Sequence, residues 1–133
     1  MIRLIPYFNS TILPATPNCE WEPTASHRVI DGGYEDTDRL VRSELDYEAL
    51  YSGHIESYEL ERVFRAMNAD NRPNGRRERS LSVGDMIAVV LEGNPAPQAV
   101  WRVTSVGFQE QRPIPAPILA DVRTSTTNER STA

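Results

Sequence analysis

The sequence contains no lysine, a single cysteine and no long hydrophobic run, and each absence excludes a class of function. All 14 basic residues are arginine, which excludes a Schiff-base lysine and a phosphate-binding loop that ends in Lys-Ser or Lys-Thr. The one cysteine, Cys19, cannot form an internal disulfide, which is typical of a reducing compartment. No apolar run reaches the roughly 18 residues of a transmembrane helix, and the first residues lack the pattern of a secretory signal. We therefore expect a cytoplasmic protein that does not bind a membrane.

Clustered catalytic or metal-binding side chains are also missing from the sequence. Cys19, His27 and His54 are isolated and lack the short spacings of zinc motifs. Carboxylate pairs such as Asp36/Asp38 and Glu59/Glu61 fall in polar segments, where we expect them to be solvated and therefore unsuited to general acid–base catalysis. The sequence predicts no catalytic residues, no metal site and no cofactor, so we expect a protein that is not an enzyme.

Charge is distributed unevenly along the 133 residues. Residues 31–61 hold ten acidic residues and two arginines, a balance of −8, whereas residues 62–79 hold six arginines and two acidic residues, a balance of +4. Three interpretations are open. The two stretches neutralise each other on one surface, the arginines of residues 72–79 contact nucleic acid, or the acidic stretch mimics nucleic acid and blocks a basic partner.

The second half of the chain gives the clearest structural pattern. Leu60, Val63, Phe64 and Met67 fall at i, i+3, i+4 and i+7, which predicts a helix over residues 57–67 with one apolar stripe. Residues 86–91 are apolar on both faces and predict a buried central strand. A turn-forming segment separates them from residues 99–106, and these two strands are expected to pair as an antiparallel hairpin, with a bulge or kink at Gly107.

The remaining segments are less regular. Residues 2–8 predict a strand that Pro6 confines to a sheet edge or ends early. Residues 27–30 predict a short strand, and residues 37–51 fit a helix or a strand, with a strand favoured for the second half. The length suits one α+β domain over residues 1–110, in which a small, mostly antiparallel sheet of about four to five strands packs against the principal helix 57–67. Residues 111–133 are Pro-rich and then polar, and we expect a tail that is disordered from about residue 122.

A compact turn links the predicted helix to the predicted central strand. Leu81 is expected to enter the core while the hydroxyls of Ser80 and Ser82 accept hydrogen bonds from the backbone of the turn. Gly84 permits the turn, and the carboxylate of Asp85 is expected to accept backbone N–H groups from residues 80–83. We interpret this motif as a rigid corner that locks the helix against the strand.

Residues 60–108 resemble the YodL-like family of small domains that are carried by phages, mobile elements and their hosts. The resemblance rests on three strings: Val63-Phe64-Arg65-Ala66-Met67-Asn68, Arg79-Ser80-Leu81-Ser82-Val83-Gly84-Asp85-Met86-Ile87, and Ser105-Val106-Gly107-Phe108. A polar loop with Arg72-Pro73 joins the first two. The family core is expected over residues 57–110. The resemblance implies a fold and a genomic setting beside antirestriction or plasmid-transfer proteins, and it implies no enzymatic activity.

These observations lead to one functional hypothesis and one alternative. The first is a non-catalytic accessory protein of a phage or mobile element that binds a host protein through its separate acidic and arginine-rich surfaces. The alternative is a nucleic-acid-binding module that uses residues 72–79, or an acidic nucleic-acid mimic of the antirestriction type. The sequence does not indicate an oligomeric state. The candidate binding edge consists of Asn68, Arg72, Arg76, Arg77, Arg79 and Ser80.

Overall fold

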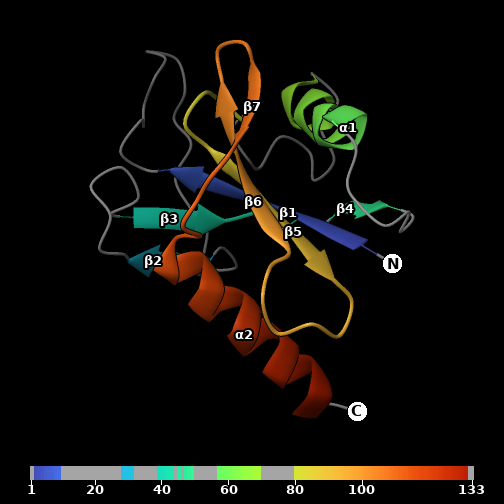
Figure 1. Cartoon of the computed structure of the whole chain (residues 1–133), viewed down its shortest axis with the longest axis vertical. Helices are drawn as coiled ribbons and strands as arrows, with labels where there is room; N and C mark the ends of the chain where they lie inside the picture. Colours follow the sequence, from blue (N-terminus) through green and yellow to red (C-terminus); the bar gives the residue numbers. More distant parts are fainter. Residues whose placement is uncertain are drawn as a thin grey trace.

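The computed structural model describes residues 2–9, 28–31, 39–43, 45, 47–49, 57–69 and 80–131. Within these residues the chain forms seven strands and two helices (Figure 1). Their bounds are β1 Ile2–Asn9, β2 Arg28–Asp31, β3 Arg39–Arg42, β4 Tyr47–Ala49, α1 Ser57–Asn68, β5 Met86–Leu91, β6 Ala99–Thr104, β7 Gly107–Glu110 and α2 Ala116–Ser131. The strands form a single sheet in the order β2-β3-β1-β5-β6-β7, and β4 also pairs with β1. Every pairing is antiparallel.

The α+β class and the antiparallel sheet are confirmed, and so are the principal helix and the β5–β6 hairpin. The expected number of strands was too small. The ambiguous stretch at residues 37–51 contributes two strands, β3 and β4, and the hairpin continues into β7. Gly107 begins β7 with a φ of 145°, so the kink expected there is the turn between β6 and β7.

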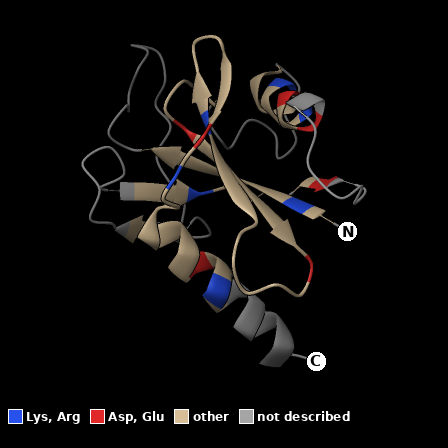
Figure 2. Ribbon diagram, viewed as in Figure 1, with Lys and Arg blue, Asp and Glu red and all other residues tan. Residues whose placement is uncertain are grey.

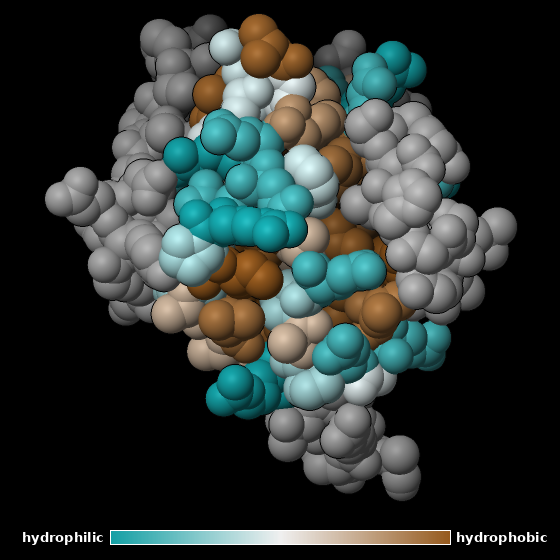
Figure 3. Space-filling view, viewed as in Figure 1, coloured by the Kyte–Doolittle hydropathy of each residue, from teal (hydrophilic) through white to brown (hydrophobic). Residues whose placement is uncertain are grey.

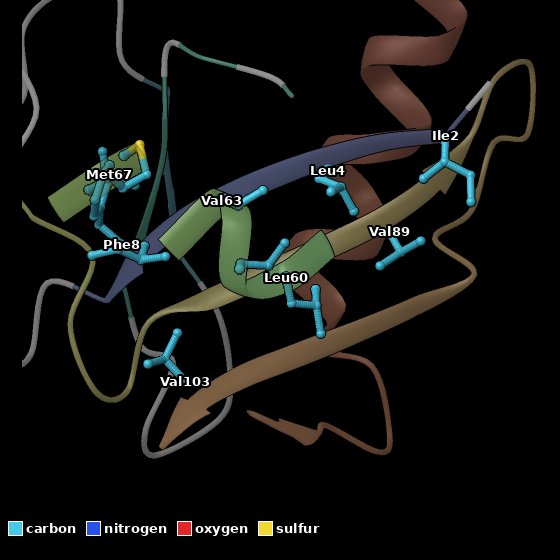
Figure 4. Packing of buried hydrophobic residues seen from close by; sticks show 11 residues of the cluster. Ile2, Leu4, Phe8, Leu60, Val63, Met67, Val89 and Val103 are labelled. Atoms are coloured by element: carbon cyan, nitrogen blue, oxygen red, sulfur yellow. The ribbon is translucent and has the colours of Figure 1, made fainter. Parts of the chain in front are cut away.

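The two helices flank the sheet, one on each face, and each covers its own apolar cluster. On the α1 face, the buried side chains include Leu60, Val63 and Met67 of the helix, packed over residues of β1, β5 and β6 (Figure 4). On the other face, Ile118 and Val122 of α2 pack with a second group of strand residues that includes Tyr7, Met86 and Val100. Burial of one such side chain contributes about 1.5–3 kcal/mol to stability. Because the central strands carry apolar side chains on both faces, each face gains this contribution from its own helix.

Strand β1 lies at the centre of the sheet, although Pro6 predicted an edge. Its partner on one side is β5, and on the other side β4 covers residues 2–4 while β3 covers residues 7–9. The carbonyl of Pro6 accepts a hydrogen bond from the N–H of Ser43, which follows β3. Since the N and the C=O of one strand residue point to the same side, the nitrogen of Pro6 faces the junction between β3 and β4. The missing N–H therefore costs no ladder bond, and a central proline is tolerated.

The predicted corner between α1 and β5 is confirmed in its main features. Leu81 is 1% exposed in the core, and Gly84 has a φ of 98°. The carboxylate of Asp85 is fully buried and accepts the N–H of Ser82 at 2.8 Å. It also accepts the N–H of Asn9 at 2.8 Å. One detail differs, because the hydroxyl of Ser82 donates to the carbonyl of Ser80 at 3.4 Å instead of accepting a hydrogen bond.

The second contact of Asp85 replaces a missing bond of the sheet. The register Tyr7↔Met86 would place Asn9 opposite Gly84, two residues before the start of β5. At that point the chain has turned toward β6, since the N–H of Gly84 donates to Val103 and the carbonyl of Asp85 accepts from Val103. The side chain of Asp85 supplies the acceptor that the backbone no longer offers to Asn9, so the buried N–H of Asn9 is satisfied.

The C-terminal segment is not the tail that the composition suggested. Residues 116–131 form α2, and Ile118 and Val122 are 0% and 2% exposed. Ile114, Ile118 and Val122 recur every four residues and all contact the same cluster. The Pro-rich and polar composition of the segment concealed this spacing, which buries apolar surface of the first half of α2 against the sheet. Residues 132 and 133 lie outside the described residues.

A buried polar network attaches α2 to the sheet. Tyr7 and Arg42 are register partners on β1 and β3, so their side chains share the α2 face. Both reach Asp121 of α2: the Tyr7 hydroxyl donates to Oδ2 at 2.7 Å, and Arg42 donates to the same oxygen at 2.8 Å. The Asp121 side chain is fully buried and that of Arg42 is 13% exposed.

Replacing Asp85 with alanine tests the corner. Asp85→Ala removes the carboxylate that accepts from the buried N–H of Asn9 and the partly buried N–H of Ser82, and we expect the free energy of unfolding to fall by about 3–5 kcal/mol in urea denaturation. Ser82→Ala removes only the long hydroxyl contact and should cost less than about 0.5 kcal/mol. Equal effects of the two substitutions would contradict the assigned role of the carboxylate.

The attachment of α2 is tested by Asp121→Ala. This substitution removes the buried carboxylate that accepts from Arg42 and Tyr7, and thermal or urea unfolding should show a loss of about 3 kcal/mol. Arg123 lies on the exposed side of the same helix, and Arg123→Ala should change stability by less than about 0.5 kcal/mol. If Asp121→Ala were as stable as the parent chain, like Arg123→Ala, the C-terminal segment would not be attached to the sheet through Asp121.

Candidate functional site

A pocket of about 570 Å³ lies between α1 and the β6–β7 hairpin. We call it the hairpin pocket. Aliphatic and aromatic side chains form its walls together with the polar residues Glu61, Thr104 and Ser105, and its rim follows the turn of the hairpin. The lining residues are Leu60, Glu61, Phe64, Trp101, Val103, Thr104, Ser105, Val106, Gly107 and Phe108. Its volume and apolar character are those of pockets that bind an organic group by burial and shape.

Local patterns in three elements position the pocket walls. Leu60 and Phe64 lie one helical turn apart on α1, while Trp101 and Val103 alternate onto the same face of β6. Phe108 on β7 is the register partner of Val103. The rings of Phe64 and Phe108 meet edge to face, with centroids 6.4 Å apart and an interplanar angle of 84°. This contact, worth about 0.5–1.5 kcal/mol beyond burial, joins the helix to the hairpin at one side of the pocket.

The end of the sheet beside the pocket mouth carries exposed apolar side chains. Val106, in the hairpin turn, is 94% exposed, and Val83, in the corner before β5, is 56% exposed. Extending the register Met86↔Arg102 by three residues places Val83 opposite Ser105, so both valines lie at the same end of the sheet. Figure 3 shows apolar surface over the tip of the hairpin, at the top of the view. Since folding gains nothing from an exposed valine, this end is suited to a partner that buries it.

The charged side chains of α1 are paired with one another. Arg65 and Glu61 form an ion pair at 2.9 Å, and Arg62 lies 3.4 Å from Glu59. Arg62 also donates to the carbonyl of Glu48 at 2.8 Å. Figure 2 accordingly shows blue and red interleaved on this helix. These pairs join the end of the acidic stretch at residues 31–61 to the start of the basic stretch at residues 62–79. They favour the interpretation that the acidic and basic stretches neutralise each other.

The candidate binding edge is only partly described by the structure. Arg72, Arg76, Arg77 and Arg79 lie outside the described residues. The side-chain amide of Asn68 donates to the carbonyl of Phe64 at 2.7 Å and to that of Leu81 at 3.1 Å. Ser80 is half-buried and its carbonyl accepts from Ser82. Asn68 therefore ties the end of α1 to the corner, which is a structural use of that side chain.

Strand β7 ends the sheet and presents one row of backbone groups away from it. Gln111 donates its N–H to Val100 of β6 at 2.7 Å, so Gln109, two residues earlier, also faces β6. Val103, the register partner of Phe108, uses its own N–H and C=O toward the corner. The backbone groups of Phe108 and Glu110 consequently point outward, and among the described residues no hydrogen bond reaches them.

The described residues hold no metal-binding cluster and no membrane-spanning helix. Among the residues that the structure describes, no group of three or more His, Cys, Asp or Glu side chains could hold a metal ion. Within the same part of the chain, no helix combines the length and apolarity required to span a membrane. Beside the pocket, Glu110 pairs with Arg112, and this hydrogen bond, together with the attraction of the carboxylate, raises the pKa of the arginine.

The fold and its pocket define a small three-layer α+β domain with an open apolar site at one end of the sheet. A model of the YodL-like domain family matches residues 27–112, so the chain belongs to the YodL-like family. The match is longer than the resemblance at residues 60–108 and takes in the strands from β2 to β7, α1 and the hairpin pocket. No curated protein and no solved structure matches the chain significantly.

The backbone direction in β7 gives a measurable pattern of hydrogen exchange. In the free protein, the amides of Gln109 and Gln111 should exchange slowly because they donate to β6, whereas those of Phe108 and Glu110 should exchange at least roughly tenfold faster, relative to their intrinsic rates. Residue-resolved exchange by NMR measures the four amides together. Uniform protection along β7 would mean that the outer edge is already paired.

Proposed function

We propose that this protein is a non-catalytic accessory protein of a phage or mobile element that acts by binding a host protein in the cytoplasm. The family supports the genomic setting, because YodL-like domains are associated with such elements. The hairpin pocket is the observation that carries the binding function. It combines an apolar cavity of about 570 Å³ with Val106, which is 94% exposed at its rim.

The arrangement is suited to recognition of a protein side chain or short segment. Aromatic and aliphatic walls favour the burial of an apolar anchor, and anchors of this kind dominate the energy of many protein interfaces. The acidic and arginine-rich stretches were the surfaces first expected to bind. On α1 the described charged side chains form the ion pairs Arg65–Glu61 and Arg62–Glu59, so the proposal relies on the apolar and aromatic lining of the pocket for attraction at this end of the sheet.

Site-specific photo-crosslinking tests the proposal. A photo-reactive residue at position 106 of the full chain should give one discrete adduct in a bacterial lysate, because that position lies at the pocket rim. Position 109 is the matched control, since Gln109 is exposed on the same hairpin but its side chain lies on the opposite face of β7 from Phe108. Excess parent protein should suppress the adduct, whereas excess Val106→Asp should not.

Two results would contradict protein binding at this site. One is the absence of any adduct at position 106, and the other is an identical set of adducts at positions 106 and 109. The alternative function, nucleic-acid binding through residues 72–79, makes a different prediction: binding to DNA or RNA that weakens steeply with salt, with the slope reduced by roughly one for each arginine removed. Salt-dependent anisotropy measurements on the same protein distinguish the two functions.

A further inference from the structure

We infer that the partner binds as an extended segment that adds a strand to the free edge of β7 and places an apolar side chain in the hairpin pocket. This inference rests on the proposed function and specifies the shape of what is bound. It follows from the position of the pocket beside a sheet edge whose outward backbone groups pair with none of the described residues.

The backbone of β7 supplies the first half of the recognition. Phe108 and Glu110 each offer an outward N–H and an outward C=O, two residues apart. This spacing is the repeat of an antiparallel or parallel ladder, and an added strand would satisfy all four groups. Helical segments satisfy their own backbone groups and would leave these four unpaired.

The pocket supplies the second half. In a strand that pairs with β7, side chains alternate between the two faces of the sheet. Those on the α1 face lie next to Phe108, whose ring forms a wall of the pocket and touches Phe64 of α1. A side chain entering there meets Leu60, Trp101 and Val103, all apolar or aromatic.

Charge on the edge favours an uncharged apolar anchor over a charged one. Glu61 at the rim is paired with Arg65, and Glu110 on the edge strand is paired with Arg112. Among the described residues of the site, Glu61 and Glu110 already have ion-pair partners, so a charged side chain that entered the pocket would lose its hydration without meeting an unpaired opposite charge. The partner segment is therefore an extended peptide with an aliphatic or aromatic residue at the pocket position.

Proline substitution separates the backbone contribution from the side chain. Glu110→Pro removes an N–H that points outward, which an edge strand tolerates, while Glu110→Ala removes the carboxylate and keeps the N–H. Both variants should melt within a few degrees of the parent chain. Gln109→Pro removes an N–H that faces β6 and should be clearly less stable.

The probe is a set of linear peptides selected from a displayed random library for binding to the full chain. We expect Glu110→Pro to weaken their binding about three- to tenfold relative to Glu110→Ala, which is the effect of one backbone hydrogen bond. Methylation of successive peptide nitrogens should weaken binding at alternate positions only, as strand pairing requires. On binding, the amides of Phe108 and Glu110 should become protected from exchange.

The remaining outcomes overturn the inference in distinguishable ways. If Glu110→Pro and Glu110→Ala bind equally and methylation shows no alternation, strand addition is wrong, while crosslinking at position 106 can still uphold the proposed function. If the chain dimerises and Glu110→Pro restores the monomer, the edge pairs with a second copy and the partner segment is ruled out. If no peptide binds although a crosslinked partner is found, the partner does not bind as a linear segment.

Discussion

The buried carboxylate of Asp85 accepts the N–H groups of Asn9 and Ser82, and the arrangement of the rest of the sheet depends on these two hydrogen bonds. One of them closes the corner that follows α1, and the other completes the end of the central strand β1. Because the Asp85 side chain accepts the N–H of Asn9, the backbone of Gly84 does not have to pair with β1. Its N–H donates to the carbonyl of Val103 in β6. The position of the β6–β7 hairpin, and with it the pocket under α1, follows from that turn.

The two helices stabilise this sheet by different means. α1 packs through an apolar stripe, and its charged side chains pair with one another. α2 adds to its apolar contacts a hydrogen-bonded Asp121 that joins neighbouring strands through Tyr7 and Arg42. A buried ion pair of this kind gives little net stability compared with apolar packing, but it fixes the position of the helix. The sheet is thus held on both faces, while none of the described strands pairs with the outer edge of β7.

Elements whose signal is local in sequence could be predicted. The helix at 57–67 followed from four apolar residues at helical spacing, β5 from its continuous apolar run, and the corner from Ser82, Gly84 and Asp85. Features that depend on the pairing of distant strands could not. Pro6 lies in a central strand only because β3 and β4 divide its other side, and the contacts of Asp121 require the register of β1 with β3. The sequence showed the apolar residues of α1 and of the hairpin as separate patterns. That they line one pocket depends on where the hairpin packs against α1.

The most direct test of this account is the hydrogen exchange of two amides, those of Asn9 and Ser82. Both donate to the carboxylate of Asp85. The account predicts that both amides exchange with free energies close to that of global unfolding, as slowly as the amides of β5. Rapid exchange of both at the rates of exposed turns would show that the corner is open to solvent, and would contradict the position of the hairpin and its pocket.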